Sequence, residues 1–140
     1  MPGYAWPLLA LAVTLAGGLA VRRRLLIVTV VGDSMTPSFT DGDVLLAVCR
    51  RRAAVGDVVV FRNPLRAHGG LDSLVKRLVA VAGDPVPPDI RPAAGCDIVP
   101  VGKAVVRGDN ADSIDSRKLG LIAVSDIHAV VRMRLQEAGT

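Results

Sequence analysis

The chain has 140 residues and a formal net charge of +4, a length that suits one small domain with a single core. Hydrophobic residues make up 51% of the sequence but aromatic residues only 3%. Because exposed aromatic side chains provide the surface on which bases stack, this composition argues against a single-stranded nucleic-acid platform. The basic residues are also not accompanied by a helix-turn-helix, zinc-finger or RNP-type motif. We therefore expect no nucleic-acid partner.

The first expected element is an uncharged apolar segment, residues 4–21. As a helix, about 18 residues just cross a hydrocarbon layer of roughly 30 Å. Tyr4 and Trp6 suit one membrane interface, and the three arginines at residues 22–24 suit lipid head groups at the other. We predict that residues 1–24 form a transmembrane anchor with a basic flank. A cleavable secretory signal and a buried helix are the alternatives, but a signal has its basic residues before the apolar run.

Residues 25–136 predict one all-β domain. Short segments rich in Val, Leu and Ile alternate with Gly and Pro turns, a pattern typical of strands. The expected strands are residues 25–31, 43–49, 58–61, 74–81, 103–107 and 128–135. Residues 84–94 contain four prolines and are expected to be irregular, and no helix is expected after the anchor. The predicted fold is a compact mixed or antiparallel β-sheet domain on a single N-terminal transmembrane helix.

The two cysteines, Cys49 and Cys96, leave the redox state open. They are too far apart in the sequence for a local metal clip, and two thiols alone do not complete a structural zinc site. One disulfide in an oxidising compartment and two unpaired thiols both agree with the sequence. We expect no metal and no organic cofactor.

Several familiar catalytic motifs are absent from the sequence. It has no phosphate-binding Gly-rich loop ending in Lys-Ser/Thr and no His-Glu-x-x-His motif. His68 precedes two glycines in an expected loop, and His128 opens the last expected strand. A Ser-His-Asp triad would need one of them beside an exposed serine. The Gly-x-Ser-x-Gly elbow is not met either, because Thr36 follows Ser34-Met35.

A candidate nucleophile lies at the end of the first expected strand, in the segment Gly32-Asp33-Ser34-Met35-Thr36-Pro37-Ser38-Phe39. A serine on such a turn has an exposed hydroxyl, and the backbone N–H groups beside it could form an oxyanion hole. The alternative is an ordinary turn serine.

A candidate base lies inside the strand expected at residues 74–81. Alternation places Lys76 on the same face as Leu78 and Ala80. A lysine on a buried face is costly unless it is neutral or paired, and burial lowers its pKa. A desolvated amine is a workable base for a serine hydroxyl. The alternative is that the side chain reaches solvent with its charged end.

A third segment, residues 108–117, is dense in short polar side chains: Gly108-Asp109-Asn110-Ala111-Asp112-Ser113-Ile114-Asp115-Ser116-Arg117. Taken alone it reads as an Asx-rich turn. Together and in this order, the three segments resemble the type I signal peptidases, a family that includes the mitochondrial inner-membrane peptidases. The matching residues are Ser34-Met35-Thr36-Pro37-Ser38, Lys76-Arg77 with Gly83-Asp84, and Gly108-Asp109-Asn110, Ser113, Asp115-Ser116-Arg117 with Gly120.

The resemblance implies a role for each candidate. Ser34 would attack the scissile carbonyl, and its backbone N–H would serve the oxyanion hole. Lys76 would take the serine proton, and Ser113 would hydrogen-bond the lysine amine and orient it. Asp115 and Arg117 would form a structural ion pair near the site.

The chain departs from the family pattern in three places. Gly32 stands where some members carry a serine two positions before the nucleophile, so a side-chain oxyanion donor is missing. About 30 residues separate Lys76 from Gly108, too few for the large second β-domain of the bigger bacterial enzymes. The third segment is also one residue shorter before Ser113 than in those enzymes.

The function implied by the resemblance is removal of signal or leader peptides from translocated precursor proteins. The partners would be secretory precursors and membrane lipid, and the catalytic domain would lie on the extracytoplasmic side of the plasma membrane. The arginines at residues 22–24 favour the opposite orientation by charge alone. Three alternatives stay open: a dedicated maturation protease for one secreted peptide or metalloprotein, a self-cleaving repressor with the same dyad, and a non-enzymatic basic membrane module.

Overall fold

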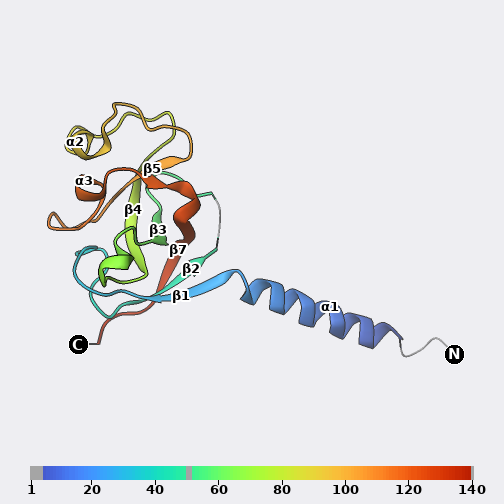
Figure 1. Cartoon of the computed structure of the whole chain (residues 1–140). Coiled ribbons are helices and arrows are strands. Elements are labelled where there is room, and N and C mark those ends of the chain that lie inside the picture. The colour runs from blue at the N-terminus through green and yellow to red at the C-terminus, as the bar shows by residue number, and fades with distance from the viewer. Residues whose placement is uncertain (1–4, 50–51, 140) are drawn as a thin grey trace.

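A computed structural model describes residues 5–49 and 52–139 and shows one helix followed by a single β-sheet (Figure 1). The helix is α1 (Ala5–Arg22). The strands are β1 (Leu25–Thr29), β2 (Val44–Val48), β3 (Val58–Arg62), β4 (Ser73–Val81), β5 (Lys103–Arg107), β6 (Ile122–Ala123) and β7 (Ile127–Gln136). Four short turns of helix connect them: η1 (Arg66–His68), α2 (Arg91–Ala94), α3 (Ser116–Leu119) and η2 (Val124–Asp126).

The seven strands form one sheet in the order β1-β2-β7-β3-β4-β5-β6, and every neighbouring pair is antiparallel. The prediction of a mostly β domain is confirmed, and the six expected strands are found with small differences at their ends. β6 was missed because a two-residue strand shows no alternation. The last strand crosses to the middle of the sheet, between β2 and β3, and so ties the first half of the domain to the second.

The expectation of no helix after the first was wrong. Residues 84–94 end in the short helix α2. Pro92 is compatible with this helix because it lies in the first turn, where a backbone N–H has no acceptor within the helix. α3 begins after Asp115, whose carboxylate caps the helix by accepting the Arg117 N–H at 3.0 Å. Both helices are single turns that lie beside each other at one end of the domain (Figure 1).

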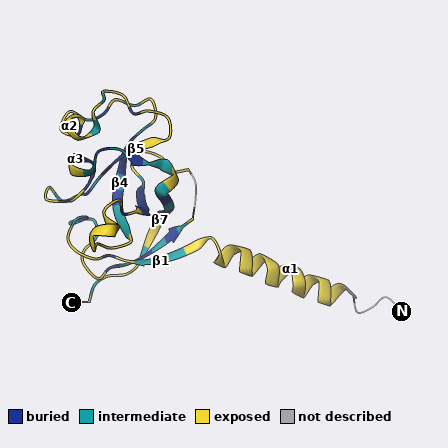
Figure 2. Cartoon of the chain, in the orientation of Figure 1, coloured by how far each residue is buried: buried dark blue, intermediate teal, exposed yellow. Residues whose placement is uncertain are grey.

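The predicted N-terminal helix forms and projects away from the sheet, with its side chains exposed from Trp6 to Arg22 (Figure 2). Within residues 5–49 and 52–139, no helix has both the length and the apolar character needed to cross a membrane. The transmembrane part of the prediction is therefore not confirmed. Tyr4, expected at a membrane interface, and Arg50 and Arg51 lie outside the described residues.

The core lies between the central strands and the loops that cover them (Figure 2). Val59 and Phe61 of β3, Leu78 of β4, Val106 of β5 and Val130 of β7 are almost completely buried and pack in one cluster. Burial of such side chains contributes about 1.5–3 kcal/mol each. β4 therefore has a fixed inner face, on which Lys76 is buried together with Leu78.

The loop between β1 and β2 is held by the end of the chain. Asp43 is fully buried and accepts hydrogen bonds from the N–H groups of Thr40 at 2.9 Å and Ala138 at 2.8 Å. These bonds lower the pKa of Asp43, and Arg134, whose Nε lies 3.4 Å from the carboxylate, acts in the same direction. Arg134 also donates to the Ser38 carbonyl. The loop that carries Ser34 is thus fixed at both sides.

Cys49 and Cys96 are both free thiols.

Candidate active site

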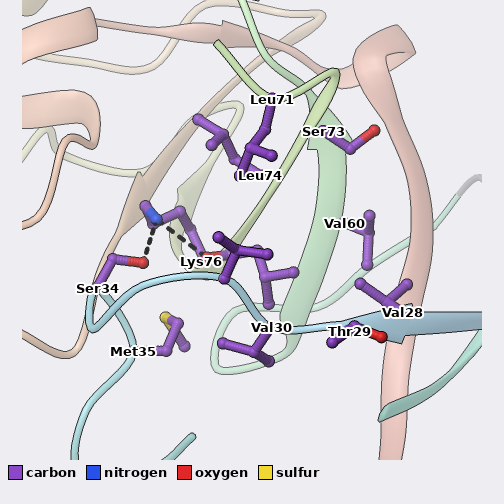
Figure 3. A pocket seen from close by; sticks show the side chains of 12 residues that line it. Val28, Thr29, Val30, Ser34, Met35, Val60, Leu71, Ser73, Leu74 and Lys76 are labelled. Carbon is purple, nitrogen blue, oxygen red and sulfur yellow. Dashed lines mark hydrogen bonds between the residues drawn. The ribbon is translucent and has the colours of Figure 1, made fainter. Parts of the chain in front are cut away.

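Ser34 and Lys76, 42 residues apart in the sequence, are in direct contact. Lys76 Nζ donates a hydrogen bond to Ser34 Oγ at 2.7 Å (Figure 3). Ser34 comes from the loop after β1, and Lys76 comes from the middle of β4. The fold therefore brings the candidate nucleophile and the candidate base together.

The Lys76 side chain is 3% exposed, so the predicted burial is confirmed and the solvent-reaching alternative is wrong. Its second hydrogen bond goes to the Val75 carbonyl at 3.1 Å. Among the described residues, no carboxylate pairs with it within 4.0 Å. Burial lowers the pKa of the Lys76 amine below its ordinary value of 10.5, and the negative charge of Asp115 partly opposes this shift.

The sheet leaves room for this contact. On one side Lys76 pairs with Val59 of β3, but on the other side β4 begins to pair with β5 only at Arg77. Before Arg77, this side of β4 therefore has no strand partner among the described residues. The Lys76 side chain projects from the face of the sheet, where the loop that carries Ser34 meets it.

The segment at residues 108–117 holds the backbone around Ser34. The Asn110 N–H donates to the Ser34 carbonyl at 3.0 Å, and Asn110 Nδ2 donates to the Asp33 carbonyl at 3.0 Å. The Thr36 N–H closes a turn onto the same Asp33 carbonyl at 3.0 Å. The contacts of the described residues include no acceptor for the Ser34 N–H, so this donor is available at the site.

The predicted ion pair between Asp115 and Arg117 is present and bidentate, with N–O distances of 2.9 and 2.7 Å. Asp115 is fully buried and also accepts the Gly108 N–H at 2.7 Å. Burial alone would raise the pKa of Asp115, but hydrogen bonds from Arg117 and Gly108 outweigh it and lower the pKa below the ordinary value. The buried carboxylate therefore stays charged and fixes the segment that holds Ser34.

Ser113 differs from the expectation. It is 3% exposed, and within residues 5–49 and 52–139 its Oγ has no hydrogen-bond partner. The expected bond to Lys76 is not formed, and the two hydrogen bonds of the amine go to Ser34 Oγ and to the Val75 carbonyl. The hydroxyl instead packs against Gly108, where an added Cβ would lie 2.1 Å from Ser113 Oγ.

A second ion pair beside the site was missed from the sequence. Arg77 Nε and Nη2 bind the two carboxylate oxygens of Asp109 at 2.9 and 2.7 Å, and Arg77 Nη1 donates to the Gly56 carbonyl at 2.9 Å. The hydrogen bond from Arg77 lowers the pKa of Asp109. Both residues lie in the segments singled out above, but a partly buried charge pair between residues 32 positions apart has no signal in a single sequence. The pair joins β4 to the segment at residues 108–117.

Two pockets meet at Ser34 and Lys76. The first, which we call the apolar pocket, has a volume of about 60 Å³ and is lined mainly by residues 28–31 and 73–76, with Met35 and Val60 (Figure 3). The second, which we call the polar pocket, has a volume of about 310 Å³ and is lined by Asp33, Asn110, Asp112, Ser113 and their apolar neighbours. Ser34 and Lys76 line both.

The model of the family described as signal peptidase, peptidase S26, matches residues 5–89, more than half of the chain. The chain belongs to this family. It is therefore a serine peptidase of the signal-peptidase class, whose substrates are precursor proteins. No curated protein matches the chain. The matched span contains Ser34 and Lys76 and ends before residues 108–117.

Gly108 is expected to be essential to the geometry of this peptidase. A Cβ there would lie 2.1 Å from Ser113 Oγ and 2.6 Å from the Ser34 carbonyl oxygen. Overpacking of this kind costs about 1–3 kcal/mol, and a small displacement of a nucleophile can cost roughly 100-fold in rate. We expect Gly108→Ala to lower the rate of precursor cleavage by more than tenfold, and by as much as roughly 100-fold. We also expect it to lower the thermal unfolding midpoint.

The matched control is Gly139→Ala, because nothing lies within 4 Å of the Cβ added there. It should keep the activity and unfolding midpoint of the unmodified chain. Equal cleavage rates for the two variants would show that the contact between Gly108 and the Ser34 backbone does not position the nucleophile.

Proposed function

We propose that this chain is a membrane-associated endopeptidase that removes signal or leader peptides from translocated precursors, with Ser34 as nucleophile and Lys76 as general base. The observation that carries the proposal is the buried amine, 3% exposed and without a carboxylate partner among the described residues, 2.7 Å from the serine hydroxyl. A charged ammonium is poorly tolerated in such a place. The neutral amine is the form that can accept a proton from Ser34.

The reaction begins with Lys76 in its neutral form. In this form the hydrogen bond is reversed, and Lys76 Nζ accepts the hydrogen of the Ser34 hydroxyl. Ser34 Oγ forms a bond to the scissile carbonyl carbon as its proton passes to the amine. The resulting ammonium then donates a proton to the leaving nitrogen as the peptide bond breaks. Water, deprotonated by the same amine, hydrolyses the acyl-enzyme and restores Ser34.

The surroundings stabilise the ammonium while it exists. The Val75 carbonyl accepts one of its hydrogens at 3.1 Å, and the charge of Asp115 favours the protonated form. The environment thus lowers the pKa of Lys76 but still allows the amine to become protonated. A general base that accepts a proton and later returns it needs both properties. Asp115 and Arg117 act structurally in this account, because they fix the segment that holds the Ser34 backbone.

The developing oxyanion is assigned to the backbone N–H of Ser34. This donor has no acceptor among the contacts of the described residues, and Gly32 offers no side-chain hydroxyl to assist it. A positioned N–H at an oxyanion can contribute roughly 2.7–4 kcal/mol to transition-state stabilisation.

A substrate in extended conformation fits beside the dyad. β1 is an edge strand, and β4 has no β5 partner before Arg77, so both offer unpaired backbone groups. The apolar pocket between residues 28–31 and 73–76 has a volume of about 60 Å³, which suits a side chain as small as that of alanine. These features support cleavage after a small residue.

A dedicated maturation protease with the same chemistry is the second candidate. The feature that favours it is the short connection between Lys76 and Gly108, which leaves little surface beyond the site for a broad range of precursors. Cleavage of many unrelated precursors would favour the general role, and cleavage of one would favour the dedicated role.

The dyad is tested by removing each member. Ser34→Ala and Lys76→Ala should each abolish cleavage of a secretory precursor, and the double variant should be no worse, because the two side chains act as one unit. Lys76→Met keeps the apolar length of the side chain without the amine and should be equally inactive while remaining folded. His68→Ala and His128→Ala should retain activity. Near-normal cleavage by Lys76→Met would remove lysine from the mechanism.

Specificity is tested with precursors altered around the cleaved bond. We expect cleavage to require a small residue, such as Ala, immediately before the bond and again two residues earlier. A bulky residue at either position should lower kcat/KM by well over tenfold. For the residue immediately before the bond, the reason is that a pocket of about 60 Å³ cannot accept it; for the residue two positions earlier, the expectation rests on the family alone. Efficient cutting after Phe or Leu in a peptide library would contradict this assignment.

The location proposed for the domain is the outer face of the membrane, with α1 in contact with lipid. The exposed apolar side chains along α1, followed by the basic residues 22–24, support the contact with lipid. The outer face follows from the proposed reaction, because signal peptides are cut after they have crossed the membrane. Alkaline phosphatase fused after Thr140 should be active, because it folds only outside, and a fluorescent protein exported unfolded at the same position should be dark. A bright fluorescent fusion with inactive phosphatase would place the domain in the cytoplasm.

A further inference from the structure

The polar pocket lies directly beyond the proposed dyad. It shares Val31, Ser34, Leu74 and Lys76 with the apolar pocket, so the two pockets adjoin at the Ser34–Lys76 contact. Its remaining wall comes from Asp33 and from the segment at residues 110–114. With a volume of about 310 Å³, it has room for one or two residues with side chains larger than that of alanine.

The small apolar pocket suits the residue before the cleaved bond, which assigns the polar pocket to the residues after it. Residues 28–31 and 73–76 line the apolar pocket and lead along β1 and β4 to Ser34 and Lys76. A peptide that enters along these edges with its acyl part in the apolar pocket brings the scissile carbonyl to Ser34. The residues after the bond then continue into the polar pocket.

The charged groups that face the polar pocket are mostly anionic. Asp33 and Asp112 line it, and within residues 5–49 and 52–139 neither carboxylate has a hydrogen-bond or ion-pair partner. Its only lining cation is Lys76, which is neutral when it acts as base. Arg117 is close enough to interact with Asp112, but its guanidinium is engaged by the buried Asp115. A cationic side chain in this pocket would therefore meet two carboxylates and no competing free cation.

Ser113 supplies an independent indication that a ligand binds here. It lines the polar pocket, is 3% exposed, and its Oγ has no hydrogen-bond partner within the described part of the chain. A buried hydroxyl without a partner costs about 1–3 kcal/mol in free energy. Rotation of the Ser113 side chain away from Gly108 would bring this hydroxyl to a backbone group of a bound peptide, which is a reason for a polar ligand to bind at this place.

We propose that the polar pocket binds the first two residues after the scissile bond and selects a cationic side chain there through Asp33 and Asp112. Ser113 Oγ hydrogen-bonds the backbone of the same segment. The proposal rests on the proposed function, because it assumes that the bond is cleaved at Ser34. It defines the substrates as precursors whose mature chain begins with Lys or Arg in one of its first two positions.

The test uses full-length chain and peptides that share one signal segment and differ only after the bond. The first two residues are Ala-Ala, Lys-Ala, Ala-Lys, Glu-Ala or Ala-Glu. We expect kcat/KM for the better Lys peptide to exceed that for Ala-Ala by roughly threefold to tenfold, and the matching Glu peptide to fall below it. A peptide with Lys at the eighth position should match Ala-Ala, and high salt should reduce the preference.

The Asp33→Asn/Asp112→Asn variant should lose the preference, so that its Lys to Ala-Ala ratio is close to 1. The ratio is taken within one variant and so is independent of any overall change in activity. Asp97→Asn removes the same charge from a residue that is 82% exposed outside the pocket, and it should keep the wild-type ratio. If the double variant is inactive, calorimetric binding of the uncleaved peptides to Ser34→Ala gives the second measurement, with Lys peptides binding more tightly than Glu peptides.

Three results would each overturn the assignment of the polar pocket while leaving the dyad intact. They are equal rates for the Lys, Ala-Ala and Glu peptides, a preference for Glu, and a Lys preference that remains in Asp33→Asn/Asp112→Asn. Two results would overturn the proposed function and the pocket assignment together. One is cleavage that does not depend on Ser34. The other is that no peptide is cleaved and that all peptides bind Ser34→Ala equally.

Discussion

The burial of one amine is the constraint on which the rest of the site depends. Lys76 is nearly inaccessible to solvent and has no carboxylate partner among the described residues, so its charged form is disfavoured in the folded chain. Because its pKa is lower in the folded than in the unfolded state, folding releases a proton between that lowered value and 10.5, and stability rises with pH across this window. Below the lowered value, the full cost of the buried cation is present. We infer that the fold tolerates this cost because Lys76 must have a lowered pKa to act as the base for Ser34.

The geometry around the amine is maintained by charge pairs that do not themselves take part in the proposed proton transfer. Asp109 joins residues 108–117 to β4 through Arg77, and Asp115 fixes the same segment internally through Arg117. Asn110 then holds the backbone of Asp33 and Ser34. Buried ion pairs contribute little net stability but impose one arrangement, which is what a serine and an amine 2.7 Å apart require.

Sequence patterns predicted the parts of this structure that follow from periodicity. Alternation along residues 74–81 placed Lys76 on the face of Leu78, and Gly and Pro turns located six of the seven strands. The environment of Ser113 was not predictable, because it depends on how closely Gly108 approaches it from another segment. β6 and α2 are too short to leave a periodic signal. The pockets are likewise formed by segments that meet only in the folded chain, so no local pattern shows them.

Direct titration of the Lys76 amine tests the central claim. The sequence has three lysines, so the ¹⁵Nζ and ¹³Cε NMR signals of the labelled full chain can be assigned by comparison with Lys76→Met. The account predicts that the Lys76 signal titrates with a midpoint below 10.5 in the folded chain and returns to the ordinary value when the chain is unfolded in denaturant. A midpoint at or above 10.5 in the folded chain would contradict it, because the amine would then be a permanent cation beside Ser34.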